Sequence, residues 1–166
     1  MPLIENGRAV ADTWVSLADD AALPADGGVI VSFARWQAER DALSARPAPL
    51  GIRLPSTVPA GAIAPDLERV ALVVVEFPKF RDGRGFTTAR ELRERWGFRG
   101  EIRAIGNIIA DQYPLLVRCG VSTVDVPEGT DVETWARTLN TVTIAYQAAV
   151  SADEPLALLR RRVAAA

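Results

Sequence analysis

The chain has 166 residues, of which 49% are hydrophobic and 24% are charged, and its formal net charge is -2 at pH 7. This composition is typical of a globular domain with one core, and it lacks the basic excess of nucleic-acid-binding proteins. No apolar run reaches the roughly 18 residues that a membrane span needs, and the first residues lack a signal-peptide layout. We therefore expect a cytoplasmic protein that binds neither nucleic acid nor membranes.

The sequence contains no histidine and a single cysteine, Cys119. Without histidine there is no histidine-based triad, and the commonest zinc and haem ligands are missing. One cysteine cannot form an intrachain disulfide or hold an iron–sulfur cluster, so we expect no metal site. Cys119 is expected to be a small buried hydrophobe. The sequence identifies no cofactor, so any electrons would pass through a bound organic group or a partner.

Short strand-like and helix-like runs follow one another along the chain. Asn6-Gly7 predicts a β-hairpin, which residues 13–17 would extend as a ribbon. The predicted strands are 3–5, 8–11, 28–33, 50–54, 69–77, 100–106 and 122–126, and the predicted helices are 34–46, 88–96, 107–119 and a long one from 130. Thr88 and Glu91 fit a capping box, and Pro114 either kinks its helix or occupies its first turn.

Alternating strands and helices predict an α/β fold with a mostly parallel sheet of about five strands, flanking helices and an N-terminal β-hairpin. The sheet is either an open flavodoxin-like sheet or an incomplete arc of a βα-barrel. We expect one domain, with the ribbon at 1–17, the βα core at 28–150 and a tail at 151–166. The apolar stripe from Trp135 to Tyr146 belongs either to the core or to a homodimer surface.

The stretch EFPKFRDGRGF, residues 76–86, follows the most apolar strand and precedes a helix. Its cations are Lys79, Arg81 and Arg84, its acids are Glu76 and Asp82, and its glycines are Gly83 and Gly85. Arginine and lysine bind oxyanions, glycines let backbone N–H groups approach, and a helix N-terminus adds positive potential. The stretch therefore predicts an anion site at the carboxyl ends of the strands, where such folds bind ligands. The alternative is an exposed loop whose charges balance.

Further polar residues accompany the next predicted strand. Arg103 lies within it, joins the candidate anion site, and if buried would need Glu76, Glu101 or Asp111 as a partner. Glu76 and Asp111 are the candidate catalytic acid–base groups, and Asn107 is either a site residue or a helix N-cap. The expected supporting residues are Asp82, Gly83, Gly85, Asn107 and Gln112.

Two neighbouring features are weaker signals of ligand binding than the loop cations. Gly83 and Gly85 partly match a dinucleotide fingerprint, but Thr88 holds the third glycine position and the first glycine comes late after the strand. The charged residues from Arg90 to Arg95 are predicted to form a solvated helix face.

The segment FPKFRDGRGFTTARELRERWGFRGEIRAIGNIIADQYPLLVRCG resembles a proteobacterial domain-of-unknown-function family, number 934, most strongly over about residues 70–126. Within it, the run FPKFRDGRGF is specific to that family. The family's genes commonly lie beside those for the haemoprotein subunit of sulfite reductase, and its members are often labelled probable oxidoreductases. The resemblance therefore implies a role in sulfate assimilation toward cysteine. Asn107 and Pro114 depart from the family pattern, which has an acidic residue and a continuous helix there.

The resemblance implies an accessory protein, because one cysteine and no histidine exclude the sirohaem and iron–sulfur subunit itself. Such a protein would dock on the haemoprotein subunit or deliver electrons or sulfite to it. Its loop would hold sulfite, sulfate or a phosphate group. The alternatives are a small-molecule or nucleotide-dependent enzyme that uses Glu76 or Asp111, and a binding module without catalysis.

Overall fold

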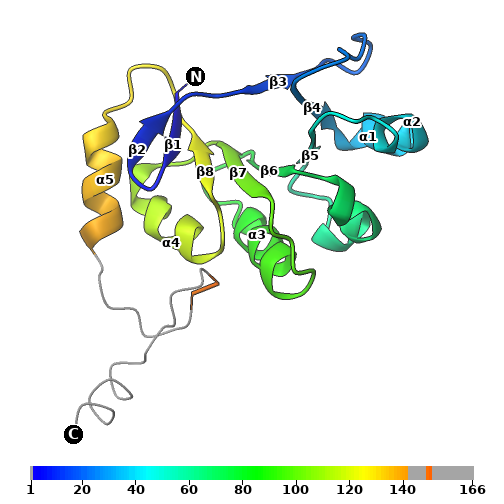
Figure 1. Cartoon of the computed structure of the whole chain (residues 1–166). Coiled ribbons are helices and arrows are strands. Elements are labelled where there is room, and N and C mark those ends of the chain that lie inside the picture. The colour runs from blue at the N-terminus through cyan, green and yellow to red at the C-terminus, as the bar shows by residue number, and fades with distance from the viewer. Residues whose placement is uncertain (1, 142–148, 151–166) are drawn as a thin grey trace, which may run out of the picture.

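The computed structural model describes residues 2–141 and 149–150, and within them one sheet of eight strands forms the centre of the molecule (Figure 1). The strands are β1 (Leu3–Glu5), β2 (Arg8–Val10), β3 (Trp14–Ser16), β4 (Gly28–Ser32), β5 (Leu50–Leu54), β6 (Leu72–Phe77), β7 (Glu101–Gly106) and β8 (Thr123–Asp125). Their order in the sheet is β2-β1-β8-β7-β6-β5-β4-β3. Neighbours from β3 to β8 are parallel, whereas β1 is antiparallel to both β8 and β2.

The prediction of about five mostly parallel strands is wrong, although the five predicted core strands are all present as β4 to β8. The hairpin joins the same sheet, because β1 pairs with the edge of β8 and so makes part of the sheet antiparallel. Its Asn6-Gly7 turn has φ values of 48° and 75°, which is the left-handed geometry that a two-residue hairpin turn requires.

β3 does not extend the hairpin ribbon as predicted. It pairs in parallel with β4 at the opposite edge of the sheet. The Trp14 ring lies over Gly28, where an added Cβ would be 2.7 Å from Trp14 Cε3, and packs with Ile30, Leu72 and Val74. Burial of this large indole, rather than local strand pairing, places the segment.

The sheet is strongly curled, as the short connection from β2 to β3 requires. These two strands are the edges of the sheet, which a flat arrangement would separate by about 34 Å at about 4.8 Å per step. Four residues of extended chain from Val10 to Trp14 reach only about 14 Å. Residues 11–13 therefore cross the inner face of the curl, where Asp12 binds Arg103 of β7.

The helices cover the outer face of the curled sheet (Figure 1). They are α1 (Phe33–Ala38), α2 (Arg40–Ser44), α3 (Arg84–Glu94), α4 (Tyr113–Arg118), α5 (Val132–Thr141) and the 3₁₀ segments η1 (Ala60–Arg69) and η2 (Ala110–Gln112). Strands β3 to β8 follow chain order without the reversal of a flavodoxin-like sheet, and right-handed crossovers then put the helices that connect these strands on one side. The sheet stays open between β2 and β3.

Two apolar clusters lie on the two faces of the sheet. Val73, Val75 and Phe77 point from β6 into the main core under the helices, while Leu72 and Val74 point to the inner face. This explains why the β6 sequence shows no polar alternation. The largest helix side chains in the main core include Trp36, Leu43, Ile63, Leu92, Tyr113, Leu116 and Trp135.

Two helix starts differ in how well the sequence predicts them. α3 begins at Arg84 and not at Thr88, and its N-cap residue is Gly83. Asp82, one position before the cap, accepts the Arg84 N–H at 3.2 Å and so holds the first turn in place. Thr88 Oγ1 instead donates to the Arg84 carbonyl at 3.2 Å. Pro114 occupies the first turn of α4, which confirms one of the two predicted alternatives.

The stripe that begins at Trp135 belongs to the core where the structure describes it. Trp135 is buried, and its ring centroid lies 5.3 Å from that of Tyr113. Tyr146 and the predicted tail at 151–166 lie outside the described residues. Cys119 is buried as predicted, and burial raises the pKa of its thiol. No helix in the described ranges is long and apolar enough to cross a membrane.

Candidate functional site

The loop of residues 78–83 follows the carboxyl end of β6 and leads into α3. Lys79 and Arg81 are exposed, and within the described residues neither has a hydrogen-bond or ion-pair partner on its side chain. Arg84 differs, since its Nη2 donates to Asp82 Oδ2 at 2.6 Å and its Nε donates to Asp82 Oδ1 at 2.8 Å. Two of the three predicted cations are thus available to an anion.

Asp82 organises the loop and links it to the neighbouring strand end. Ser56, which follows β5, donates to Asp82 Oδ2 at 3.0 Å and accepts from Arg84 Nη2 at 3.1 Å. Hydrogen bonds from the Arg84 guanidinium hold the pKa of the Asp82 carboxyl well below its usual range. Asp82 is therefore a structural anion, and it neutralises Arg84.

The two predicted acid–base groups do not form a pair. Glu76 points from β6 to the inner face, where it forms an ion pair with Arg53 of β5. Asp111 is exposed in η2 and makes no side-chain contact with Glu76 in the part of the chain that the structure describes. In those same residues, no three Asp, Glu or Cys side chains are grouped closely enough to hold a metal ion.

The glycines of the loop have packing roles. An added Cβ on Gly85 would lie 2.4 Å from Phe77 Cζ, so the glycine lets α3 approach β6. Gly83 precedes α3 in open space, with no atom within 4 Å of an added Cβ. Close helix packing, rather than a dinucleotide fingerprint, thus accounts for Gly85.

Asn107 and Gln112 shape the rim beside the loop. The Asn107 backbone N–H donates to the Phe77 carbonyl at 2.7 Å, so Asn107 binds the end of β6 through its backbone. Gln112 Oε1 accepts the Ile109 N–H at 3.2 Å, and Gln112 Nε2 donates to the Phe80 carbonyl at 3.4 Å. Gln112 therefore ties loop 78–83 to the segment that follows β7, as a supporting residue would.

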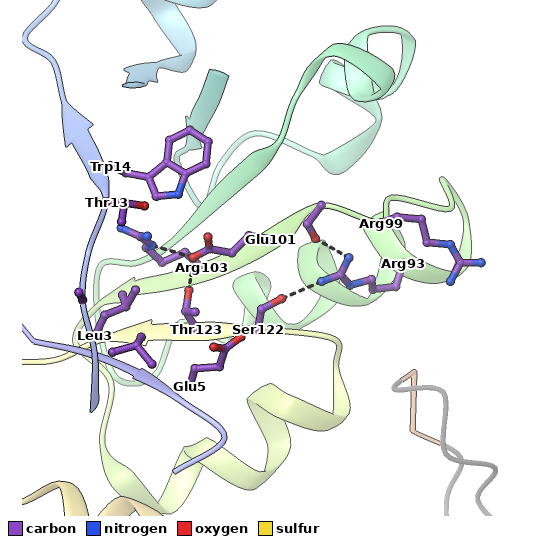
Figure 2. Close-up of a pocket in the computed structure, with 13 residues that line it drawn as sticks. Leu3, Glu5, Thr13, Trp14, Arg93, Arg99, Glu101, Arg103, Ser122 and Thr123 are labelled. Atoms are coloured by element: carbon purple, nitrogen blue, oxygen red, sulfur yellow. Dashed lines mark hydrogen bonds and ion pairs between the residues drawn. The ribbon is translucent and has the colours of Figure 1, made fainter. Parts of the chain in front are cut away.

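Arg103 does not join the loop cations. Its side chain is 4% exposed on the inner face, where Nη1 and Nη2 donate to Asp12 at 2.8 and 3.0 Å. Its Nε donates to Glu101 at 3.1 Å (Figure 2). Of its predicted partners, only Glu101 is found. Burial of Asp12 opposes its ionisation, but hydrogen bonds from Arg103 and the Trp14 N–H outweigh it and lower the pKa of Asp12. The Arg103 guanidinium and the Asp12 carboxylate thus bind each other and hold residues 11–13 across the sheet.

A cavity of about 350 Å³ opens beside Arg103 at the amino ends of β7 and β8 (Figure 2). Arg93 forms its far wall and donates to the carbonyls of Phe98, Gly100 and Gly120 at 2.8, 2.7 and 3.0 Å and to Ser122 Oγ at 3.0 Å. Arg93 is thus a structural tie between α3 and two strand starts, and its predicted place on a solvated face is wrong. The wall lies at the strand ends opposite to those that usually bind ligands.

Sequence reasoning missed a second group of polar residues, at the carboxyl ends of β3 to β5. A cavity of about 310 Å³ there is lined by Ser16, Asp19, Ser32 and Arg53, among others. Ser32 Oγ donates to Asp19 Oδ1 at 2.6 Å and accepts the Arg35 N–H at 3.0 Å, which caps α1. Arg53 was the available signal, because a cation inside a short apolar strand needs a polar surrounding.

Asp125, at the end of β8, predicts a pH dependence. Its Oδ1 is buried with no partner among the described residues, and desolvation raises the pKa of the carboxyl above 3.8. A carboxyl with a raised folded pKa binds more protons when folded, so its contribution to stability falls as pH rises through about 4 toward the folded pKa. Asp125→Asn should therefore raise the urea midpoint at pH 7 and flatten the decline above pH 4. Asp111→Asn, at an exposed site, is the control, and equal profiles for both variants would contradict the prediction.

One family profile matches the chain. It is described as a bacterial protein of unknown function (DUF934), and it matches residues 51–157, which is more than half of the sequence and includes loop 78–83. No curated protein and no solved structure matches the chain. The chain therefore belongs to the DUF934 family of bacterial proteins, as its loop sequence predicts.

Proposed function

We propose that this protein is an accessory protein of assimilatory sulfite reduction that binds a small oxyanion at loop 78–83 and acts together with sulfite reductase. The observation that carries the proposal is the exposed pair Lys79 and Arg81, which no acidic side chain of the described residues neutralises. The guanidinium of arginine fits two oxyanion oxygens, and the ammonium of lysine adds a point charge. The sulfite pathway itself comes from the family resemblance.

The position of the pair supports the proposal further. The loop follows the carboxyl end of β6, which lies inside the parallel part of the sheet, and ligands of α/β sheets bind at this end. The N-terminus of α3 contributes less, since Asp82 already accepts the Arg84 N–H there. We therefore assign anion binding to Lys79 and Arg81, and leave out Arg84 and Arg103 because carboxylates already bind them.

A thermal-shift panel of sulfite, sulfate, phosphate and nicotinamide nucleotides tests the proposal. A ligand at 100 times its Kd should raise the Tm of the wild type by about 5–10 °C. Lys79→Ala/Arg81→Ala should abolish that shift. Arg90→Ala/Arg95→Ala removes the same charge from exposed positions on and just after α3 and should keep it. No shift with any anion, or an equal shift in the first variant, would overturn the proposal.

A second candidate function is an enzyme that acts on a small molecule. The cavity at the carboxyl ends of β3 to β5, which contains Asp19, Ser32 and Arg53, favours it, with Glu76 beside Arg53 as the acid–base group. An absorbance spectrum of the purified protein distinguishes the two, because a bound flavin or nicotinamide would favour the enzyme. Glu76→Gln would then remove turnover while leaving the Lys79 and Arg81 response intact.

A further inference from the structure

Exposed apolar side chains gather near the proposed anion loop. The exposed large hydrophobic residues of the described ranges are Val15, Phe80, Trp96, Ile109 and Leu115. Three of them, Phe80, Ile109 and Leu115, belong to the segments that follow β6 and β7 and are 50%, 41% and 48% exposed. We refer to these three residues as the apolar patch.

Gln112 joins the members of the apolar patch. Its side-chain amide binds the backbone of Ile109 and of Phe80, at 3.2 and 3.4 Å. Leu115 follows Gln112 by three positions in the continuous helical segment from η2 to α4, so the two side chains lie on the same side of that segment. The Gln112 side chain therefore joins Phe80 of loop 78–83 to Ile109 of the segment after β7, and Leu115 lies on the same side of that segment.

The composition of this surface is that of a protein interface. Single exposed hydrophobic residues are common, but clusters of large ones with a charged border mark interaction sites. Covering them would contribute roughly 25 cal/mol per Å² of apolar area. Lys79 and Arg81 stand on either side of Phe80 in the chain, so the apolar patch has a cationic border, with the exposed Asp111 as a nearby acid.

We infer that the apolar patch is a docking surface for a partner protein that presents an apolar pocket bordered by carboxylates. Charge decides between this partner and a second copy of the chain. Two copies meeting at this surface would bring together two cations and one carboxylate from each side, which leaves net repulsion, whereas an acidic partner complements Lys79 and Arg81. The inference rests on the proposed function, since an accessory protein must dock, and it adds the surface and chemistry of docking.

Direct binding to the purified haemoprotein subunit of sulfite reductase tests the inference. Phe80→Ser/Ile109→Ser should weaken binding at least about tenfold, because apolar anchors at an interface centre dominate its affinity. Val15→Ser, at an apolar residue that is 56% exposed on β3, should leave binding unchanged. Lys79→Ala/Arg81→Ala should slow association and reduce its salt dependence. Surface substitutions of this kind should leave Tm nearly unchanged, which a melting curve checks.

The outcomes separate the inference from the proposed function. If the wild type and Phe80→Ser/Ile109→Ser bind the subunit equally, the apolar patch is not the docking surface, while the accessory role stands. If the wild type does not bind the subunit at all, both the partnership and the inference are overturned. If sedimentation shows a dimer that Phe80→Ser/Ile109→Ser dissociates, the occupant is a second copy and the inference is wrong.

Discussion

Replacing Arg103 with methionine should lower the free energy of unfolding by about 2–4 kcal/mol. Methionine keeps much of the side-chain volume but leaves Asp12 and Glu101 without the cation that both of them bind. Breaking a fully buried pair costs about 3–5 kcal/mol, but the Asp12 side chain is 36% exposed and recovers part of its hydration. Urea denaturation at pH 7 measures the change.

Two further variants make the Arg103 prediction specific. Arg90→Met breaks an exposed ion pair with Glu94 on α3 and should leave the urea midpoint almost unchanged. Adding Asp12→Asn to Arg103→Met should restore part of the lost stability, because the substitution removes one of the unpaired charges. If Arg103→Met behaves like Arg90→Met, the connection of residues 11–13 does not depend on this ion pair.

Replacing Gly106 with alanine should also destabilise the protein, by about 2–4 kcal/mol. Gly106 ends β7 with φ at 108°, and an added Cβ would lie 2.4 Å from the Phe77 carbonyl oxygen. That carbonyl accepts the Asn107 N–H at 2.7 Å, so relief of the clash would move the end of β6, where loop 78–83 begins. Both the unfolding curve and the anion response should therefore change.

Gly83→Ala is the matched control for Gly106→Ala. Gly83 has φ at -81° and open space around an added Cβ, and alanine at a helix cap changes stability by about 1 kcal/mol or less. Equal urea midpoints for the two variants would show that the close approach of Gly106 to Phe77 places no constraint on the rim.

Much of the fold follows from local sequence, and the exceptions follow from long-range packing. The strands β4 and β6 can be predicted from their apolar runs, because strands covered on both faces need no polar alternation. The pairing of β3 with β4 cannot be predicted from the local sequence. It depends on the packing of Trp14 over Gly28 and against the apolar side chains of the inner face. The start of α3 does not follow from the Thr88 box, because the hydrogen bond from the Arg84 N–H to Asp82 forms only in the folded loop and begins the helix one turn earlier.

The candidate site divides in the same way. Loop 78–83 could be predicted because its cations follow an evident strand and precede an evident helix. The position of Arg103 on the inner face, away from the loop, could not be predicted, because its partner Asp12 is 91 positions away in the chain. Nor does the sequence say which cation Asp82 neutralises, since Arg81 and Arg84 are both close enough to reach it and only the folded loop selects Arg84.

The most direct test of the oxyanion loop is a titration of the ¹⁵N-labelled protein with sulfite, followed by amide chemical shifts. Saturable shifts should appear at Lys79, Arg81 and their loop neighbours, and should disappear in Lys79→Ala/Arg81→Ala. Amides at Arg103 and Thr123, which line the cavity at the other strand ends, should stay unchanged. Shifts centred on that cavity, or none at saturating sulfite, would contradict the assignment of anion binding to Lys79 and Arg81.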